Sequence, residues 1–247
     1  MVWAVSEAIT FGKFFPGGNL EAVRGGQRNE WQTGWYSRLD AMAEEMAPAK
    51  LAQLRENHND YSSYVVRKFN SEPGVYTLPF EMVLEPVQEW EYPRSHTLKR
   101  KNAVLADLFE ASDRIWCVRE GLKRVIERVE PDTHEFFPLE INQPDGEPYD
   151  GTFYTMVIGT WLTAFSFEDT PAEAFHDNRP KVEDFDLRNE RKANYSKLAF
   201  KRSVIGDAHL WRERRHRGNM ICLSDTLKAA IDAAGLVLPK TLKVREV

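Results

Sequence analysis

The sequence predicts a mixed α+β fold in a single domain, built around a strand-helix unit that occurs twice. The chain has 247 residues, of which 42% are hydrophobic, so one domain of this size buries a sizeable core. Predicted strands and helices are interspersed without a sustained βαβ rhythm, which favours a mixed fold over a doubly wound parallel sheet. Residues 114–127 also align with residues 219–232, and each copy predicts a short apolar strand followed by a helix.

The first hundred residues predict an irregular, aromatic-rich region with short elements. Apolar residues at three- and four-residue spacing predict a helix over residues 38–56, which Pro48 breaks or restarts. β-branched and aromatic residues predict strands at 64–69 and 74–78, on either side of a turn that contains a Pro-Gly pair. A short helix is expected at 102–110.

The repeated strand-helix unit places the two cysteines, Cys117 and Cys222, at the same position of the two strands. Ser224 is a suitable N-cap for the second helix. Glu120 and Asp225 are acids in the first helical turn, where a carboxylate interacts favourably with the helix dipole. Two thiols can form a redox pair or ligate a metal, but the C-x-x-C spacing is absent. We therefore expect both cysteines to be small buried residues of the core.

The segment between the two copies predicts mainly strands. Residues 135–141 are expected to form a strand, 143–146 a turn, and 151–167 one long or two short buried strands. A polar stretch at 168–190 follows, and a further strand is expected at 208–212. The second copy of the strand-helix unit follows this strand after a basic turn.

Motifs that carry catalysis are absent from the sequence. It contains no Gly-rich dinucleotide fingerprint, phosphate-binding loop, nucleophile elbow or H-E-x-x-H helix. The alternative function is a metal-dependent nuclease or other hydrolase that uses Asp207, His209, Glu213 and His216. Three arginines lie among these residues and Arg217 follows them. These four arginines would compete with a cation, so we favour a strand with a buried Trp211 followed by a solvated basic turn. We expect no enzymatic activity, no metal and no cofactor.

The charges of the chain are segregated along the sequence. Residues 127–150 hold eight acids and one base, and residues 168–190 hold eight acids and three bases. The two stretches together carry −12, so the modest total of −5 leaves +7 on the remaining residues. An acidic surface beside aromatic residues such as Phe175 fits a basic partner, although charged loops that serve only solubility explain the pattern equally well. The candidate partner-binding residues are Glu168, Asp169, Asp177, Glu183, Asp184, Phe185 and Asp186.

The cellular compartment follows from what the sequence lacks. Two cysteines are too few for a disulfide framework, and the first residues have no positively charged segment of the kind that begins a signal peptide. The longest apolar run, at 156–165, is interrupted by polar residues and glycine. We expect a cytoplasmic protein without a membrane span, and the acidic total predicts no direct binding of nucleic acid.

A resemblance to a known family rests on Trp3 and on four segments of the chain, in which apolar and helix-capping residues occupy the matching positions. The four segments are residues 115–129, 134–140, 202–212 and 223–228. In this pattern the chain resembles the eleventh immunity-protein family of bacterial polymorphic toxin systems. The resemblance implies a family core at 113–247 and a variable N-terminal region at 1–112 that packs on the same domain.

The resemblance further implies a non-enzymatic antitoxin that binds a toxin encoded beside it and neutralises the toxin inside the producing cell. Such families commonly accompany nuclease toxins, so the expected partner is a basic nuclease domain whose active or substrate-binding site is covered. No catalytic residues of the family transfer to this chain. The acidic stretch at 168–190 departs from the family pattern, which makes it the expected place of specificity towards one toxin. A homodimer remains open, as does a regulatory or scaffolding protein that uses the same acidic faces.

Overall fold

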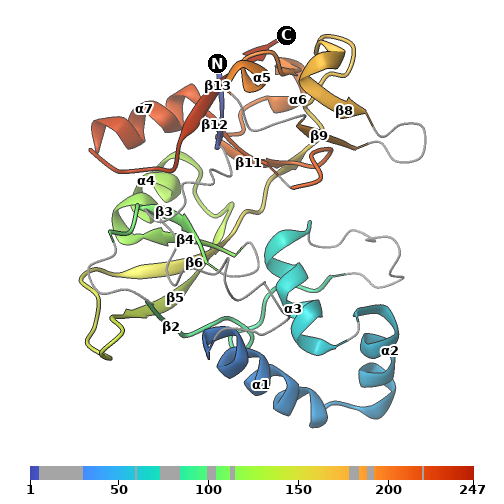
Figure 1. The fold of residues 1–247 in the computed structure, drawn as a ribbon, viewed down its shortest axis with the longest axis vertical. Coiled ribbons are helices and arrows are strands. Elements are labelled where there is room, and N and C mark those ends of the chain that lie inside the picture. Colours follow the sequence, from blue (N-terminus) through green and yellow to red (C-terminus); the bar gives the residue numbers. More distant parts are fainter. Residues whose placement is uncertain are drawn as a thin grey trace.

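The computed structural model describes residues 1–5, 30–58, 60–72, 84–98, 104–111, 115–177, 184–187, 192–218 and 220–247. Helices and strands are interspersed along the chain without regular alternation, and the strands form mixed sheets, so the predicted α+β fold is confirmed. Figure 1 shows a helical region at one end of the molecule, a five-stranded sheet in the middle and a six-stranded sheet at the other end.

The helical region contains α1 (Glu30–Glu44), α2 (Pro48–His58) and α3 (Tyr61–Asn70). Pro48 begins α2, as expected, because proline at the first helical position lacks only an N–H group that has no helical acceptor. Buried side chains of α1 and α3 pack with Ile115 and Val157 in one apolar cluster. The helices are therefore attached to the five-stranded sheet, on which α3 contacts β6.

The strand predicted at residues 64–69 is wrong, because this segment is part of α3. Buried side chains recur at helical spacing, at Tyr61, Tyr64, Val65, Lys68 and Phe69, and the Asp60 carboxylate caps the helix by accepting the Ser63 N–H. Aromatic and β-branched residues suit a strand locally, but here they form the buried stripe of an amphipathic helix. The strand predicted at 74–78 lies outside the described residues.

The five-stranded sheet has the order β2-β5-β6-β4-β3. Its strands are β2 (Ser95–Thr97), β3 (Leu108–Glu110), β4 (Trp116–Arg119), β5 (Glu135–Asn142) and β6 (Phe153–Val157). Strand β3 corrects the helix predicted at 102–110: Leu108 to Glu110 pair with β4, and backbone pairing across the sheet outweighs a local helical pattern. The expected strand at 135–141 is confirmed as β5, and the strands expected within 151–167 are confirmed as β6 and β7.

The six-stranded sheet has the order β10-β13-β1-β12-β11-β7. Its strands are β1 (Val2–Val5), β7 (Trp161–Leu162), β10 (Ala199–Phe200), β11 (Leu210–Glu213), β12 (Ile221–Ser224) and β13 (Thr241–Glu246). A separate two-stranded sheet pairs β8 (Phe175–Asp177) with β9 (Phe185–Leu187). The short helices α5 (Lys192–Tyr195) and α6 (Arg202–Ile205) flank β10.

The repeated strand-helix unit is confirmed in both copies. In the first copy α4 (Glu120–Val129) follows β4 without a loop, and in the second α7 (Asp225–Ala233) follows β12 in the same way. The Ser224 hydroxyl accepts the Leu227 N–H and caps α7, as expected. Cys117 and Cys222 are fully buried, and burial raises the pKa of both thiols, so both are protonated core residues at neutral pH.

The two sheets share a core that contains both repeated helices. Side chains of α4 and α7 pack with residues of both sheets in one cluster, which includes Trp116 and Val118 of β4 and Ile221 and Leu223 of β12. Cys117 and Cys222 point to the opposite faces of their sheets, into two separate clusters. Figure 1 shows α4 and α7 one above the other at the same side of the molecule. Within the described residues, none of the helices has the length and apolar character needed to cross a membrane.

Candidate functional site

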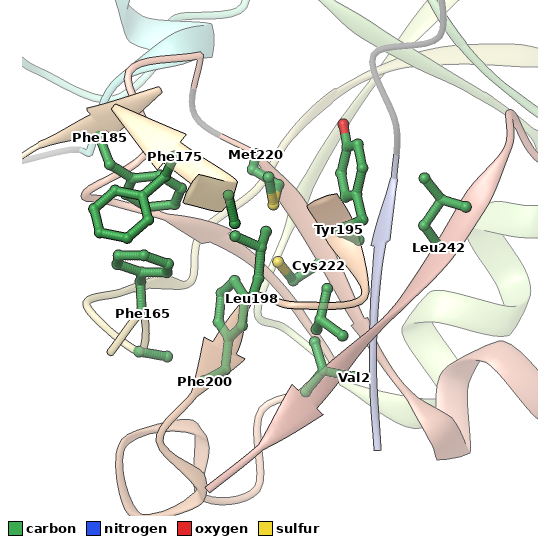
Figure 2. Close-up of a cluster of buried hydrophobic side chains, with 14 of the residues drawn as sticks. Val2, Phe165, Phe175, Phe185, Tyr195, Leu198, Phe200, Met220, Cys222 and Leu242 are labelled. Carbon is green, nitrogen blue, oxygen red and sulfur yellow. The ribbon is translucent and has the colours of Figure 1, made fainter. Parts of the chain in front are cut away.

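The described residues of the acidic stretch, 168–177 and 184–187, pack on one face of the six-stranded sheet through phenylalanine side chains. The rings of Phe165 and Phe185 are stacked with centroids 3.7 Å apart, and Phe175 packs edge-on to Phe165 at 5.3 Å. Figure 2 shows these rings beside Cys222 and Val2 of the sheet. The aromatic residues of this segment therefore hold the β8-β9 hairpin in place.

The expectation that Phe185 is a contact residue does not fit its position. The side chain is fully buried, and the Phe185 backbone forms hydrogen bonds with Arg215 and Arg217. The ring of His216 lies 5.2 Å from the ring of Phe185 and covers it further. A buried ring that stabilises the hairpin is unable to contact a partner, so the candidate surface consists of the acidic side chains alone.

Three of the acidic candidates are exposed. The Glu168 side chain is 68% accessible, and Asp169 and Asp177 are also exposed. The Ser166 hydroxyl lies 2.6 Å from a carboxylate oxygen of Asp169 and 3.1 Å from one of Glu168, so its single hydrogen is shared between two neighbouring carboxylates. The backbone N–H of Glu168 and the Ser166 hydroxyl lower the pKa of the Glu168 carboxyl. Glu183 lies outside the described residues.

The remaining described candidates, Asp184 and Asp186, are partly neutralised by a base in the turn that follows β11. The guanidinium of Arg217 lies 3.4 Å from Asp184 and 3.4 Å from Asp186. Lys201 lies 3.6 Å from Glu168 across the same face. The described part of this surface is therefore less negative than its sequence count. Its exposed carboxylates are those of Glu168, which is paired with Lys201, and of Asp169 and Asp177.

The other acidic stretch, at 127–150, runs from α4 into the five-stranded sheet. It contains one half-buried acid with structural contacts and several exposed acids. Glu130 is half-buried and structural: its carboxylate accepts the N–H groups of His209 and Leu210 at 2.8 and 2.7 Å and contacts His134 at 3.1 Å. Glu140 and Glu147 are exposed, on β5 and on the turn before β6. The two acidic stretches thus belong to different sheets and do not form one cluster.

The residues of the alternative nuclease site do not converge on a metal position. Glu213 is buried and accepts the N–H groups of Ala164, Phe165 and Arg215 at 2.9, 3.0 and 3.1 Å. Burial outweighs these bonds and raises the pKa of Glu213 to about 7. His209 instead forms a hydrogen bond with Ser224 at 2.7 Å.

His216 packs on Phe185, and Asp207 is exposed in the turn before β11. Trp211 is fully buried, as expected for this strand. In the part of the chain that the structure describes, no three His, Cys, Asp or Glu side chains form a group that could hold a metal ion. His209, Glu213 and His216 thus each contact other residues of the fold, through Ser224, three backbone N–H groups and Phe185 respectively.

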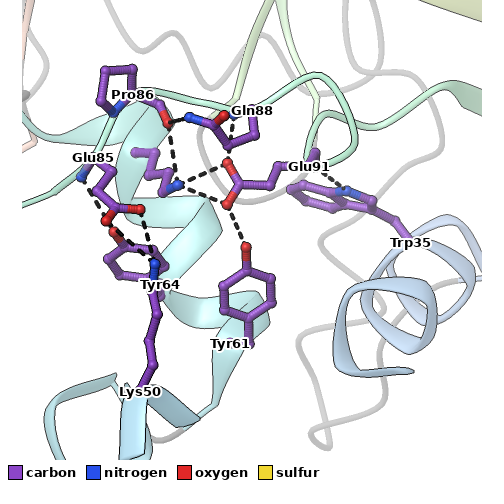
Figure 3. Close-up of polar contacts among 9 residues, drawn as sticks. Trp35, Lys50, Tyr61, Tyr64, Glu85, Pro86, Gln88 and Glu91 are labelled. Carbon is purple, nitrogen blue, oxygen red and sulfur yellow. Dashed lines mark hydrogen bonds and ion pairs between the residues drawn. The ribbon is translucent and has the colours of Figure 1, made fainter. Parts of the chain in front are cut away.

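A buried ion pair in the helical region has no counterpart in the sequence predictions. Lys68 Nζ donates to both carboxylate oxygens of Glu91 at 2.7 and 2.8 Å, and both side chains are 1% accessible. Tyr61 and the Gln88 N–H donate to the same carboxylate (Figure 3). Burial lowers the pKa of Lys68 and raises that of Tyr61. The position of Lys68 on the buried stripe of α3 could have indicated a buried lysine. No sequence pattern indicates that Glu91 is its partner.

The comparison with protein families gives one match over most of the chain. A family model described as "Immunity protein family (Imm11)" matches residues 39–240. The matched residues include α2 and α3, both copies of the strand-helix unit and the β8-β9 hairpin. No curated protein matches the chain.

Proposed function

Because the chain belongs to the Imm11 immunity protein family, which indicates a toxin-neutralising function, we propose that it binds and inhibits a basic nuclease toxin in the cytoplasm. The family match over residues 39–240 is the observation that carries this proposal. In this function the protein is an inhibitor without catalytic activity of its own. It covers the active or substrate-binding site of the toxin.

The exposed acids of the β8-β9 region support a basic partner. Glu168 and Asp169 are exposed in the turn before β8, and Asp177 is exposed at the end of β8. The buried aromatic cluster that contains Phe165, Phe175 and Phe185 anchors this region to the sheet and restricts its movement. A rigid surface loses little conformational entropy on binding, and negative charge accelerates encounter with a basic protein. A nuclease binds phosphates through basic residues, so an acidic surface complements the site that this inhibitor has to cover.

The positions of the alternative catalytic residues support an inhibitor over an enzyme. Glu213 binds three backbone N–H groups in the core, and His209 is bonded to the cap of α7. Each of these side chains has a structural partner, which explains its presence without catalysis. The direct check is an assay of nucleic-acid cleavage by the purified protein with added divalent cations, in which we expect no cleavage.

The first experiment tests the function itself. The protein is co-expressed and co-purified with the toxin domain encoded beside it, and toxicity is scored with and without the protein. We expect a stable complex and full protection of the producing cells. A toxin that remains active in the presence of excess protein would refute the immunity function.

A second experiment tests the surface separately, with a matched control on the other acidic stretch. The variant Glu168→Lys with Asp177→Lys changes the charge of the β8-β9 surface, and Glu140→Lys with Glu147→Lys makes the same charge change on the five-stranded sheet. We expect the first variant to slow association with the toxin about tenfold at low salt, and the second to leave it within about twofold. Equal effects of the two variants would place the toxin elsewhere and leave the immunity function intact.

A further inference from the structure

The two sheets have the same strand order and the same strand directions. Apart from the added edge strand β7, the order β10-β13-β1-β12-β11 matches β2-β5-β6-β4-β3 strand for strand. In both sheets the first pair is parallel and the next three pairs are antiparallel. The similarity therefore extends well beyond the strand-helix unit that the sequence alignment detects.

The register of the two sheets agrees residue by residue. Cys117 of β4 lies opposite Thr155 of β6, and Thr155 lies opposite Phe137 of β5. In the other sheet, Cys222 of β12 lies opposite Ala4 of β1, and Ala4 lies opposite Leu242 of β13. The sequence separation is twenty residues in both copies, from 117 to 137 and from 222 to 242. A coincidence of order alone would not preserve the spacing and the pairing together.

Lysine contacts on the two helices repeat in the same positions. Lys123 of α4 pairs with Glu127 at 2.7 Å, and Lys228 of α7 pairs with Asp232 at 2.6 Å. Each lysine also lies 5.2 Å from the centre of one aromatic ring, which is Tyr154 on β6 for Lys123 and Trp3 on β1 for Lys228. By the register above, Tyr154 and Trp3 occupy equivalent positions.

The same two aromatic residues bind the acid in the first turn of their helices. The indole N–H of Trp3 donates to Asp225 at 2.7 Å, and Tyr154 forms a hydrogen bond with Glu120, which lowers the pKa of that carboxyl. Glu120 and Asp225 are the first residues of α4 and α7. Strand β1 therefore makes with α7 the contacts that β6 makes with α4.

The chain order of the two sheets differs at one strand only. The five-stranded sheet is formed in the order β2, β3, β4, α4, β5, β6, and the six-stranded sheet in the order β10, β11, β12, α7, β13, with β1 from the beginning of the sequence in the last place. We infer that the six-stranded sheet is a second copy of the same β-β-β-α-β-β unit, and that β1 is its closing strand, supplied from the opposite end of the chain.

The position of the first and last residues agrees with this assignment. The α-amino group of Met1 lies 2.8 Å from the Glu246 carboxylate, and Figure 1 shows the two ends close together above the six-stranded sheet. By the register, Val247 corresponds to Asn142 at the end of β5, and Met1 corresponds to Thr152 just before β6. Residues 143–151 connect β5 to β6 in the first copy, and the equivalent strands of the second copy, β13 and β1, are the last and the first strands of the structure.

The test moves β1 to the place that β6 has in the first copy. In a permuted chain, residues 6–247 are followed by a copy of residues 143–151 and then by residues 1–5. In a second, cyclised chain, the same nine residues join Val247 to Met1 and no bond is opened. We expect the permuted chain to keep the circular dichroism spectrum and to unfold within about 5 °C of the original, and the cyclised chain to unfold about 5 °C higher because its unfolded state is constrained.

A core substitution checks that β1 occupies the same place in the original and the permuted chains. Ala4 is fully buried opposite Cys222, so Ala4→Asp buries an unpaired carboxylate and is expected to unfold the original and the permuted chains alike. An unfolded permuted chain, a cyclised chain of lower unfolding temperature, or a permuted chain that tolerates Ala4→Asp each overturns the inference. None of these measurements involves the toxin, so the outcome is independent of the proposed function.

Discussion

Charged side chains inside this protein are held by specific partners, and these partners determine what each charge contributes. Lys68 and Glu91 neutralise each other in the helical region. Glu213 is surrounded by backbone N–H groups at the end of β11. Because Lys68 and Glu91 are paired, the effect of replacing one depends on whether the other is present. The burial of Glu213 makes the stability of the protein depend on pH.

Replacing one member of the buried ion pair should destabilise the protein strongly. Lys68→Met leaves the Glu91 carboxylate buried without its cation, so we expect the free energy of unfolding to fall by about 3–5 kcal/mol. The double variant with Glu91→Met removes both charges and should recover much of this loss. Lys50→Met is the matched control, because Lys50 pairs with Glu85 at 3.3 Å on the surface and should cost less than about 1 kcal/mol. Denaturant unfolding measures all four proteins, and additive effects of the two core substitutions would contradict the coupling.

Glu213 should make the protein less stable as the pH rises towards neutral. Its pKa is raised from 4.5 to about 7 in the folded protein, so between these values the folded state keeps a proton that the unfolded chain releases. The contribution is complete below about pH 4.5 and is lost as the pH rises through about 7, with a total of up to ~3 kcal/mol. In Glu213→Gln this part of the pH dependence should disappear. The free energy of unfolding of both proteins is measured from about pH 4.5 to about pH 8. The same pH dependence in both would show that Glu213 does not titrate in this range.

At the scale of elements, single strands and helices were predictable where a local pattern agreed with the tertiary contacts. The break at Pro48, strand β5 and both copies of the strand-helix unit follow from local sequence. Helix α3 was predicted as a strand because its buried face is aromatic and β-branched, and β3 was predicted as a helix because its partner β4 is not evident from sequence. The side-chain contacts that join one element to another were not predictable either, because they connect residues far apart in the chain.

One such joint connects the end of α4 to the start of β11 through Glu130. Glu130→Ala removes the acceptor for the N–H groups of His209 and Leu210, so we expect a loss of about 2–3 kcal/mol in the free energy of unfolding. Glu127→Ala, one turn earlier on the same helix, removes only a surface ion pair with Lys123 and should cost about 0.5 kcal/mol or less. Thermal unfolding of the two variants compares them directly. Similar losses in both would mean that Glu130 does not join the two elements.

At the scale of the whole molecule, the candidate surface was only partly predictable. The segregation of charge is a property of the sequence, but the neutralisation of Asp184 and Asp186 by Arg217 depends on the parallel bridge between Phe185 and His216. The burial of Phe185 also depends on this bridge, which places His216 beside its ring. Aromatic residues in an acidic stretch suggested a contact surface, whereas they are the core that supports it. The sequence predicted a single-domain α+β fold without distinguishing two sheets, and in the structure the two sheets share one core.

The shared core predicts that the two sheets unfold together. Leu122 of α4 and Leu227 of α7 are equivalent buried residues in one cluster that both sheets line. Either substitution by alanine should lower the free energy of unfolding by about 2–5 kcal/mol, and because the cluster belongs to both sheets, the loss should be the same in each. Hydrogen exchange of the amides of β4 and β12 measures the two sheets separately. Val204→Ala, on an exposed side chain of α6, is the control and should leave both unchanged. If Leu122→Ala weakened protection in β4 alone, the two copies would be independent folding units.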